Sequence, residues 1–184
     1  MLVFEQKNLN YNDLCDQAKE FCNDYEYKRG KLGIYRSEDF QNKQLLNLVV
    51  NENLIKLFKN YDCEPQDIFI THESKVNEIT RNNYLHFDRQ RCLKVLVYLE
   101  DVCTDSGPFT IAKNTAHVGE QLRLSFRNVS NYKSKKNRID LDYPEIKYEL
   151  FPITGKAGTT IIFDTDLFHM GGNITKQGKT RTII

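Results

Sequence analysis

The hydrophobic pattern of this 184-residue chain changes its period near Pro65, and that change restricts the folds it can adopt. Before this point, apolar residues recur every three or four positions between Tyr11 and Tyr25, as they do along one face of a helix. After it, short apolar runs are separated by turn residues, as in a series of strands. We therefore expect a single domain with a helical first third and a β-rich remainder.

We expect three helices in the first third of the chain. The first carries the stripe from Tyr11 to Tyr25 and stops before Gly30, because glycine often follows the last turn of a helix. The second begins at Ser37, whose hydroxyl can cap the first turn, and a short third helix begins at Asn51.

Six later segments have the pattern of strands, and Gly, Pro, Asp or Ser turns separate several of them. They are residues 67–71, 92–99, 109–112, 147–151, 159–163 and 179–184. This order predicts an α+β, mainly β fold, a double-stranded β-helix or jelly roll with the N-terminal helices packed on one sheet. In this division, residues 1–66 form a helical support and residues 67–184 form the jelly-roll core.

Composition and charge exclude several classes of protein. The 26 Lys and Arg nearly balance the 25 Asp and Glu, so the net charge of +1 argues against a globally basic nucleic-acid-binding protein. The five cysteines are odd in number and have no CxxC spacing, which fits neither a disulfide framework nor a zinc site; Cys15 and Cys22 fit the apolar stripe instead. No signal peptide or membrane-length apolar run is visible. We expect a cytoplasmic protein without a nucleic-acid or membrane partner.

One group of residues has the composition of an iron site. His86 and Asp88 are two positions apart, so on an extended segment both side chains lie on the same side and can bind one metal. His169 follows the 159–163 strand and a polar turn, where it could supply the third ligand. Two histidines and a carboxylate on one face of Fe(II) form the facial triad of non-haem oxygenases. His-x-Asp alone is a weak pattern, so its context decides.

That context resembles the phytanoyl-CoA dioxygenase-like branch of the Fe(II)/2-oxoglutarate oxygenases. The likeness covers roughly residues 67–184 and rests on four separated elements in the same order. They are residues 84–89, 93–102, 106–112, and 157–164 followed by His169 and Arg181.

The resemblance implies an enzyme that hydroxylates a small organic substrate with molecular oxygen, Fe(II) and 2-oxoglutarate. It implies His86, Asp88 and His169 as the iron ligands and catalytic centre, and Arg181 as the residue that binds the distal carboxylate of 2-oxoglutarate. Halogenases that resemble this group have a small residue at the position of Asp88, so we do not expect halogenation.

Two further residues could contact the cosubstrate, and Arg181 itself has an alternative interpretation. A buried planar cation suits the far carboxylate of a 2-oxo acid, but Arg181 taken alone could be an exposed charge at a strand edge. Lys94 interrupts an apolar strand; it could reach a carboxylate of the cosubstrate or substrate, or extend along the sheet to water. Thr110 could donate its hydroxyl to the 2-oxo acid or be an ordinary strand threonine.

Residues 118–138 are rich in basic side chains and contain one acid, Glu120. Such a run is a solvated face or, alternatively, an electropositive rim that attracts an anionic substrate. The basic residues are Arg123, Arg127, Lys133, Lys135, Lys136 and Arg138, of which we assign the first five to the rim.

Two other functions fit parts of the pattern. A cupin-like metalloenzyme, such as an isomerase, would share the barrel without needing Arg181 or 2-oxoglutarate. A non-catalytic jelly-roll binding module would need none of the triad residues. The remaining histidines, His72 and His117, are interpreted as loop or surface residues.

Overall fold

The structure, a computed structural model, describes residues 1–23, 26–27, 30–36, 40–62, 64–65, 67–74, 83–126 and 136–184; for residue 23 and the described residues 26–27 and 30–36, only the backbone is described. The helices are α1 (Tyr11–Asn23), α2 (Lys43–Val49), α3 (Glu52–Asn60), α4 (Ala116–Ser125) and α5 (Ile139–Asp142). The strands are β1 (Leu2–Glu5), β2 (Glu26–Tyr27), β3 (Gly30–Arg36), β4 (Asp67–Ser74), β5 (Leu93–Val97), β6 (Phe109–Ala112), β7 (Leu150–Ile153), β8 (Thr159–Asp164), β9 (His169–Gly171) and β10 (Thr180–Ile183).

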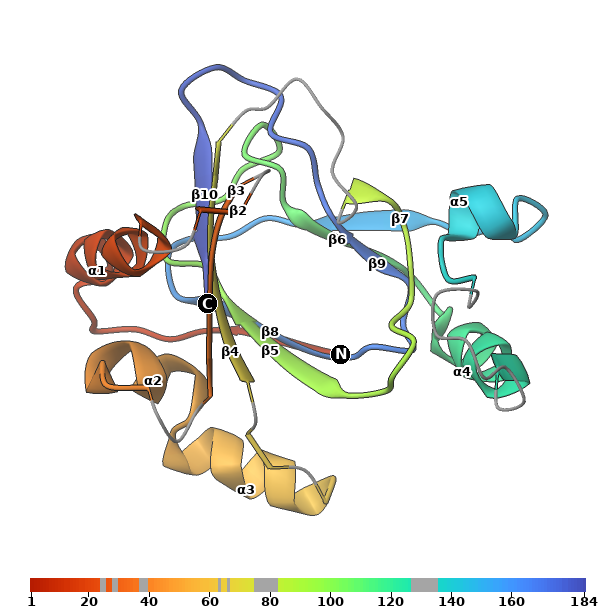
Figure 1. The fold of residues 1–184 in the computed structure, drawn as a ribbon, viewed down its shortest axis with the longest axis horizontal. Helices are drawn as coiled ribbons and strands as arrows, with labels where there is room; N and C mark the ends of the chain where they lie inside the picture. The colour runs from red at the N-terminus through yellow and green to blue at the C-terminus, as the bar shows by residue number, and fades with distance from the viewer. Residues whose placement is uncertain are drawn as a thin grey trace.

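One large antiparallel sheet is built from two strand groups, β1-β8-β5 and β10-β4-β3-β2. The groups join where β5 meets β10, because Val97 and Ile184 exchange backbone hydrogen bonds and the Leu99 N–H donates to the Thr182 carbonyl. The large sheet therefore runs in the order β1-β8-β5-β10-β4-β3-β2, curving around one side of the molecule (Figure 1).

A small sheet faces the large one and has the strand order β7-β6-β9. Two short segments extend it beyond β9: residues 85–87 bridge to β9, and residues 137–139 bridge to residues 85–87. Both bridges centre on His86, which is opposite His169 on one side and Arg138 on the other.

The space between the sheets is filled by an apolar interior cluster. Successive residues of β8 face opposite ways, so Ile161 and Phe163 enter this cluster while Ile162 packs outside against α3. Tyr98 ties the two sheets together, since its hydroxyl donates to the Ile153 carbonyl at 2.7 Å and accepts from the Phe109 N–H at 2.9 Å. The interior cluster consists of Tyr98, Val102, Phe109, Ile111, Ile153, Ile161, Phe163 and Leu167.

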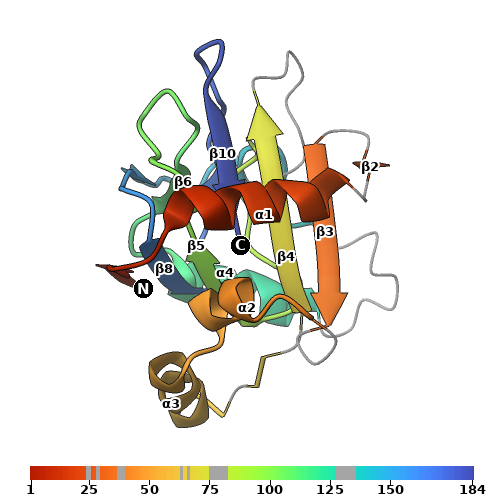
Figure 2. The ribbon, with the colours of Figure 1, turned by 90° about the vertical axis from the view of Figure 1, so that its left-hand side faces the viewer.

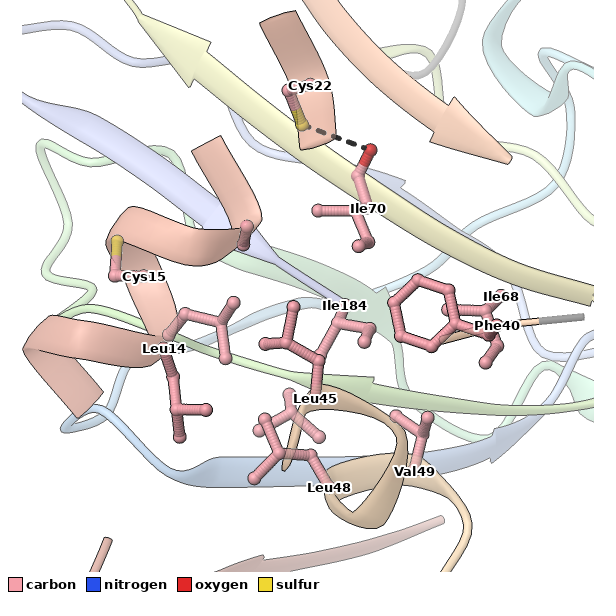
Figure 3. Close-up of a cluster of buried hydrophobic side chains, with 13 residues drawn as sticks. Leu14, Cys15, Cys22, Phe40, Leu45, Leu48, Val49, Ile68, Ile70 and Ile184 are labelled. Atoms are coloured by element: carbon pink, nitrogen blue, oxygen red, sulfur yellow. Dashed lines mark hydrogen bonds between the residues drawn. The ribbon is translucent and has the colours of Figure 1, made fainter. Parts of the chain in front are cut away.

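Helices cover the outer faces of both sheets. Figure 2 shows α1 crossing in front of β10, β4 and β3, and Figure 3 shows its apolar side chains meeting those of α2 and the sheet. The Cys22 thiol lies 3.5 Å from the Ile70 carbonyl in this contact. On the far side, α4 lies beside the small sheet, and an outer cluster of Leu85, Phe87, Ala112, Phe126, Ile139 and Phe168 fills the contact.

These observations confirm the jelly-roll core with N-terminal helices packed on one sheet. The buried positions of Cys15 and Cys22 are also confirmed. Five of the expected strands correspond to β4, β5, β6, β8 and β10, and the sixth begins later than expected, at Leu150.

The three helices expected in the first third are present as α1, α2 and α3, but the expectation that this third is helical is wrong in part, because it also contains strands. Strand β1 pairs with β8 and β3 pairs with β4, so this part of the chain supplies strands to the large sheet. The first helix ends at Asn23, and Gly30 begins a strand rather than following a helix. The second helix starts at Lys43, because the Asn42 side chain accepts hydrogen bonds from two N–H groups of its first turn; Ser37 lies outside the described residues.

Candidate active site

An extended segment beside β9 presents alternate side chains to the two faces of the small sheet. Leu85 and Phe87 are buried in the outer cluster against α4. His86 and Asp88 therefore point the other way, towards the space between the sheets. This is the arrangement that the two-residue spacing predicts.

His169 begins β9 and reaches the same space from the neighbouring strand. It is opposite Ile111 in the ladder, so it shares the inward face of the small sheet with the interior cluster. Its ring centroid lies 4.9 Å from that of Phe163 and 4.5 Å from that of His86. The imidazole is almost completely buried, and the Phe163 ring packs against one side of it.

The three side chains converge on one point. Ligand atoms of His86, Asp88 and His169 all lie within 4.8 Å of one another. The Oδ1 atom of Asp88 is 3.9 Å from Nε2 of His86 and 3.7 Å from Nε2 of His169. Two nitrogens and one carboxylate oxygen thus surround a space of the size that a metal ion needs.

Backbone carbonyls orient both imidazoles. The Nδ1 atom of His86 lies 2.7 Å from the Tyr84 carbonyl oxygen, and that of His169 lies 2.7 Å from the Leu167 carbonyl oxygen. A carbonyl can only accept, so each Nδ1 carries a proton, and in the neutral ring Nε2 then has the lone pair that a metal requires. Both rings are therefore fixed in the metal-binding tautomer.

The charge states at neutral pH also suit a cation. Burial, with a contribution from His86, lowers the pKa of His169 to about 3, so this imidazole is neutral. Burial of Asp88 opposes its ionisation, but Lys94 and the two histidines outweigh that effect and hold the pKa of Asp88 below its usual value. A neutral imidazole and an ionised carboxylate are the forms that bind metal.

Lys94 reaches a carboxylate, and that carboxylate belongs to Asp88. Lys94 is paired with Phe163 across β5 and β8, so it faces the interior, and its Nζ lies 2.6 Å from Oδ2 of Asp88. The pair occupies the second oxygen of Asp88 while Oδ1 faces the histidines. Because the Lys94 side chain is 44% exposed, the pair adds little to stability and acts mainly on the orientation of the carboxylate.

Arg181 is a buried interior residue, so its alternative interpretation as an exposed strand-edge charge is wrong. Strand β10 lies between β5 and β4, and Arg181 shares a face with Ile183, which packs against the interior cluster. Its guanidinium pairs with Glu73 directly across the ladder, and NH1 donates to the Gly172 carbonyl at 3.3 Å. Its buried Nε has no acceptor among the residues that the structure describes.

The chain crosses from one sheet to the other after His169, because β9 belongs to the small sheet and β10 to the large one. The expectation that Thr110 could donate to the 2-oxo acid is wrong. Thr110 does not reach the site: it alternates with Phe109 and Ile111, which face inward, and its hydroxyl donates to the Pro108 carbonyl at 3.0 Å.

The basic segment is only partly described. Arg127, Lys133 and Lys135 lie outside the described residues, and Lys136 is exposed. Arg123 binds both carboxylate oxygens of Asp166, at 2.6 and 2.9 Å. Asp166 is 2% exposed, so this ion pair fastens α4 to the turn that precedes His169.

The two other histidines differ in position. His72 lies on β4 and is half-buried, with its Nδ1 2.8 Å from the Thr182 hydroxyl, so the expectation of a loop or surface position is wrong. His117 is exposed on α4, as expected of a surface residue.

Sequence reasoning missed the specific roles of Glu73, Tyr84 and Arg138. Glu73 pairs with Arg181, and the guanidinium of Arg138 stacks on Tyr84 beside His86. Each contact depends on which residues of two strands are paired, and no local pattern gives that register.

The comparisons with known proteins agree with this geometry. A family model described as Phytanoyl-CoA dioxygenase (PhyH) matches residues 14–183. No curated protein matches. In the described part of the chain, none of the helices has the length and apolar composition that crossing a bilayer requires.

Several solved structures share the fold. HygX from Streptomyces hygroscopicus, with nickel and 2-oxoglutarate bound, has a TM-score of 0.58 and 12% identity, covering 99% of this chain and 79% of that one. The non-heme alpha ketoglutarate dependent epimerase SnoN from nogalamycin biosynthesis has a TM-score of 0.62 and 12% identity, covering 94% and 70%. EctD from S. alaskensis has a TM-score of 0.62 and 15% identity, covering 99% and 70%. At these identities the likeness shows a shared fold.

Proposed function

Because the chain belongs to the phytanoyl-CoA dioxygenase branch of the Fe(II)/2-oxoglutarate-dependent oxygenases, we propose that it binds Fe(II) through His86, Asp88 and His169. The observation that carries this assignment is the convergence of the three ligand atoms within 4.8 Å. The enzyme consumes molecular oxygen and a small-molecule substrate, and 2-oxoglutarate is its cosubstrate.

The donor set fits Fe(II). Two imidazoles and one carboxylate approach from one side, which would leave coordination positions open on the other. When bound, iron supplies oxygen activation coupled to the decarboxylation of 2-oxoglutarate. The protein contributes the fixed tautomers of His86 and His169, and Lys94 keeps Asp88 ionised with one oxygen directed at the metal.

Arg181 fits the distal carboxylate of 2-oxoglutarate. Its guanidinium is 3% exposed and lies on the interior face of the large sheet, and its buried Nε has no acceptor among the described residues. A carboxylate is the acceptor that such a donor needs, and arginine can bind it with two parallel hydrogen bonds. Glu73 holds the guanidinium in place across the ladder. Lys94 is the second candidate for a cosubstrate contact.

We propose hydroxylation of the substrate as the reaction. Asp88 occupies the coordination position that a halide would need, so the triad favours oxygen transfer over halogenation. SnoN, which shares the fold, is an epimerase, so the fold by itself does not select hydroxylation. Analysis of the product separates the two outcomes: a hydroxylated product gains 16 mass units as one oxygen atom, whereas an epimerised product keeps the mass of the substrate.

An anaerobic titration tests the proposed site. Fe(II) and 2-oxoglutarate added together should produce a weak visible charge-transfer band, because that band requires both groups on one metal. His169→Ala should lose it, and His117→Ala, which removes an exposed histidine on α4, should keep it. Iron binding without the band would favour a cupin-like metalloenzyme, and absence of iron binding would favour a binding module.

A further inference from the structure

A row of directly paired residues crosses the small sheet and ends at a cation. Ile111 is opposite His169, His169 is opposite His86, and His86 is opposite Arg138. Directly opposite residues project from the same face of a sheet. Since neighbouring strands are about 4.8 Å apart, the Arg138 side chain starts roughly 5 Å from that of His86 and about 10 Å from that of His169.

The residues that flank Arg138 show which way it points. Asn137 and Ile139 are both buried; Ile139 belongs to the outer cluster, and the Asn137 side chain donates to the Phe87 carbonyl at 2.7 Å. Arg138 therefore projects from the inward face. Its guanidinium carbon lies 5.1 Å from the centroid of the Tyr84 ring, and Tyr84, two residues before His86, also faces the site.

The guanidinium of Arg138 has no carboxylate partner within the described part of the chain. Its backbone N–H donates to Oδ2 of Asp142 at 2.9 Å, but its guanidinium makes no ion pair or hydrogen bond with any residue that the structure describes. By contrast, Arg91, Arg123 and Arg181 each pair with a carboxylate. Stacking on an aromatic ring orients a guanidinium and leaves its N–H edges to bind a partner.

We propose that Arg138 binds an anionic group of the substrate, a carboxylate or a phosphate, beside the metal centre. The inference rests on the proposed function for the identity of that centre and specifies its substrate class: a small organic acid or a phosphorylated molecule. A planar donor fork matches either anion through two parallel hydrogen bonds. The distance from Arg138 to the metal ligands places the carbon that reacts only a few bonds from the charged group.

The substrate anion and the cosubstrate use different walls of the site. Arg181 projects from the large sheet, whereas Arg138 projects from the extension of the small sheet. Replacing Arg138 should therefore change substrate binding and leave 2-oxoglutarate binding unaltered.

The test uses the Ni(II)- and 2-oxoglutarate-loaded protein, which binds without turnover. Inorganic phosphate and acetate are titrated in separate arms, and the arginine Nε–H signals are followed by NMR, with the Arg138 signal identified by its loss in Arg138→Gln. The wild type should bind at least one of the two anions saturably, and the arm that saturates more tightly identifies phosphate or carboxylate as the substrate group. Arg138→Gln should bind it at least about tenfold more weakly, because a charge-assisted contact is lost. Arg138→Gln lacks the Arg138 Nε–H signal, so its anion affinity is measured from the other protein resonances that shift during the titration.

Two comparison variants sharpen the result. Arg138→Lys should recover only part of the affinity, since an ammonium keeps the charge and loses the planar fork. Lys147→Gln removes an equal charge from an exposed position and should bind as the wild type does. Circular dichroism of each variant establishes that it is folded.

Equal anion affinity in Arg138→Gln and the wild type would overturn the proposal, as would the absence of saturable binding in the wild type. A loss of 2-oxoglutarate affinity in Arg138→Gln would make this residue a cosubstrate ligand instead. If the chain binds neither iron nor 2-oxoglutarate, the proposed function fails, and the same titration on the metal-free protein still decides whether Arg138 binds anions.

Discussion

Replacing Arg181 should have two separable effects, one on the fold and one on 2-oxoglutarate binding. Arg181 is buried and pairs with Glu73, whose side chain is 25% exposed. In Arg181→Ala the Glu73 carboxylate loses its partner beside an apolar interior. Breaking a buried pair costs about 3–5 kcal/mol, and the partial exposure of Glu73 places this site near the lower end.

The binding effect follows from the hydrogen bonds that the guanidinium can make to the distal carboxylate. Each charge-assisted bond contributes about 1.5–3 kcal/mol. Since about 1.4 kcal/mol corresponds to a tenfold change in affinity, the loss of one such bond already weakens binding by an order of magnitude. Arg181→Lys should retain part of the affinity, because its ammonium keeps the charge but cannot form two parallel bonds.

A second substitution separates the two effects. Glu73→Gln combined with Arg181→Ala leaves no unpaired carboxylate, so the double variant should regain most of the stability that Arg181→Ala loses. Its affinity for 2-oxoglutarate should stay low, because the cation is still absent. Urea denaturation measures the free energy of unfolding, and calorimetry with the Ni(II)-loaded protein measures 2-oxoglutarate affinity.

The decisive observation is the 2-oxoglutarate affinity of the folded double variant. Wild-type affinity there would refute the assignment of Arg181 to the distal carboxylate. Lys94 would then be the residue to test, since its ammonium is an interior cation of the large sheet and lies 2.6 Å from Oδ2 of Asp88.

Three further predictions concern the triad, the pH dependence of stability and the basic segment. Alanine at any one of the three proposed ligands should abolish iron-dependent 2-oxoglutarate turnover, and Asp88→Gly should also lose hydroxylation while keeping some 2-oxoglutarate binding; full turnover in one alanine variant would remove that residue from the triad. The pKa of His169 is about 3 in the folded protein, whereas that of an ordinary histidine is 6.5. Between these two pH values, the unfolded chain binds a proton that the folded chain does not. The metal-free protein should therefore lose stability as the pH falls below 6.5, by up to about 1.4 kcal/mol per pH unit from this group, and His169→Gln should flatten that part of the urea-denaturation profile. Neutralising the three lysines of the basic segment together should raise the KM of an anionic substrate, and added salt should reduce the effect because exposed charges are screened beyond about 8 Å; an equal change in substrate-free decarboxylation would contradict a substrate rim.

The sequence predicted the parts of the fold whose signal is local and strong. Strands β5 and β8 have both faces covered, so they read as nearly continuous apolar runs. Strand β1 contributes only four exposed residues and β9 only three residues, which are too short to show a period. In β3, Leu32 and Ile34 do alternate with other residues, but a seven-residue segment between helical patterns gives a weak signal.

The site residues, like the strands, could be predicted from the sequence only where the signal is local. The pairing of His86 with Asp88 follows from the two-residue repeat of an extended segment, which the sequence contains in full. The wrong expectation for Thr110 concerns the same two-residue repeat. The sequence shows that residues of β6 alternate between two faces, but which face points inward depends on how β6 pairs with β9. The partners of Arg181 and Arg138 depend on register between strands that lie far apart in sequence, and register is fixed by the whole sheet.

The arrangement of charges indicates how the site would separate the two anions that we propose it binds. Lys94 and Arg181 lie on the large sheet and both have carboxylate partners, Asp88 and Glu73. Both cations therefore already have a partner within the protein, and in our proposal the distal carboxylate of 2-oxoglutarate would bind at the buried Nε of Arg181, which has no acceptor among the described residues. Arg138 lies on the opposite wall, and its guanidinium pairs with no carboxylate among the described residues, so we propose it as the site of the substrate anion. Together, the two proposals would direct the cosubstrate and the substrate to different sides of the metal site.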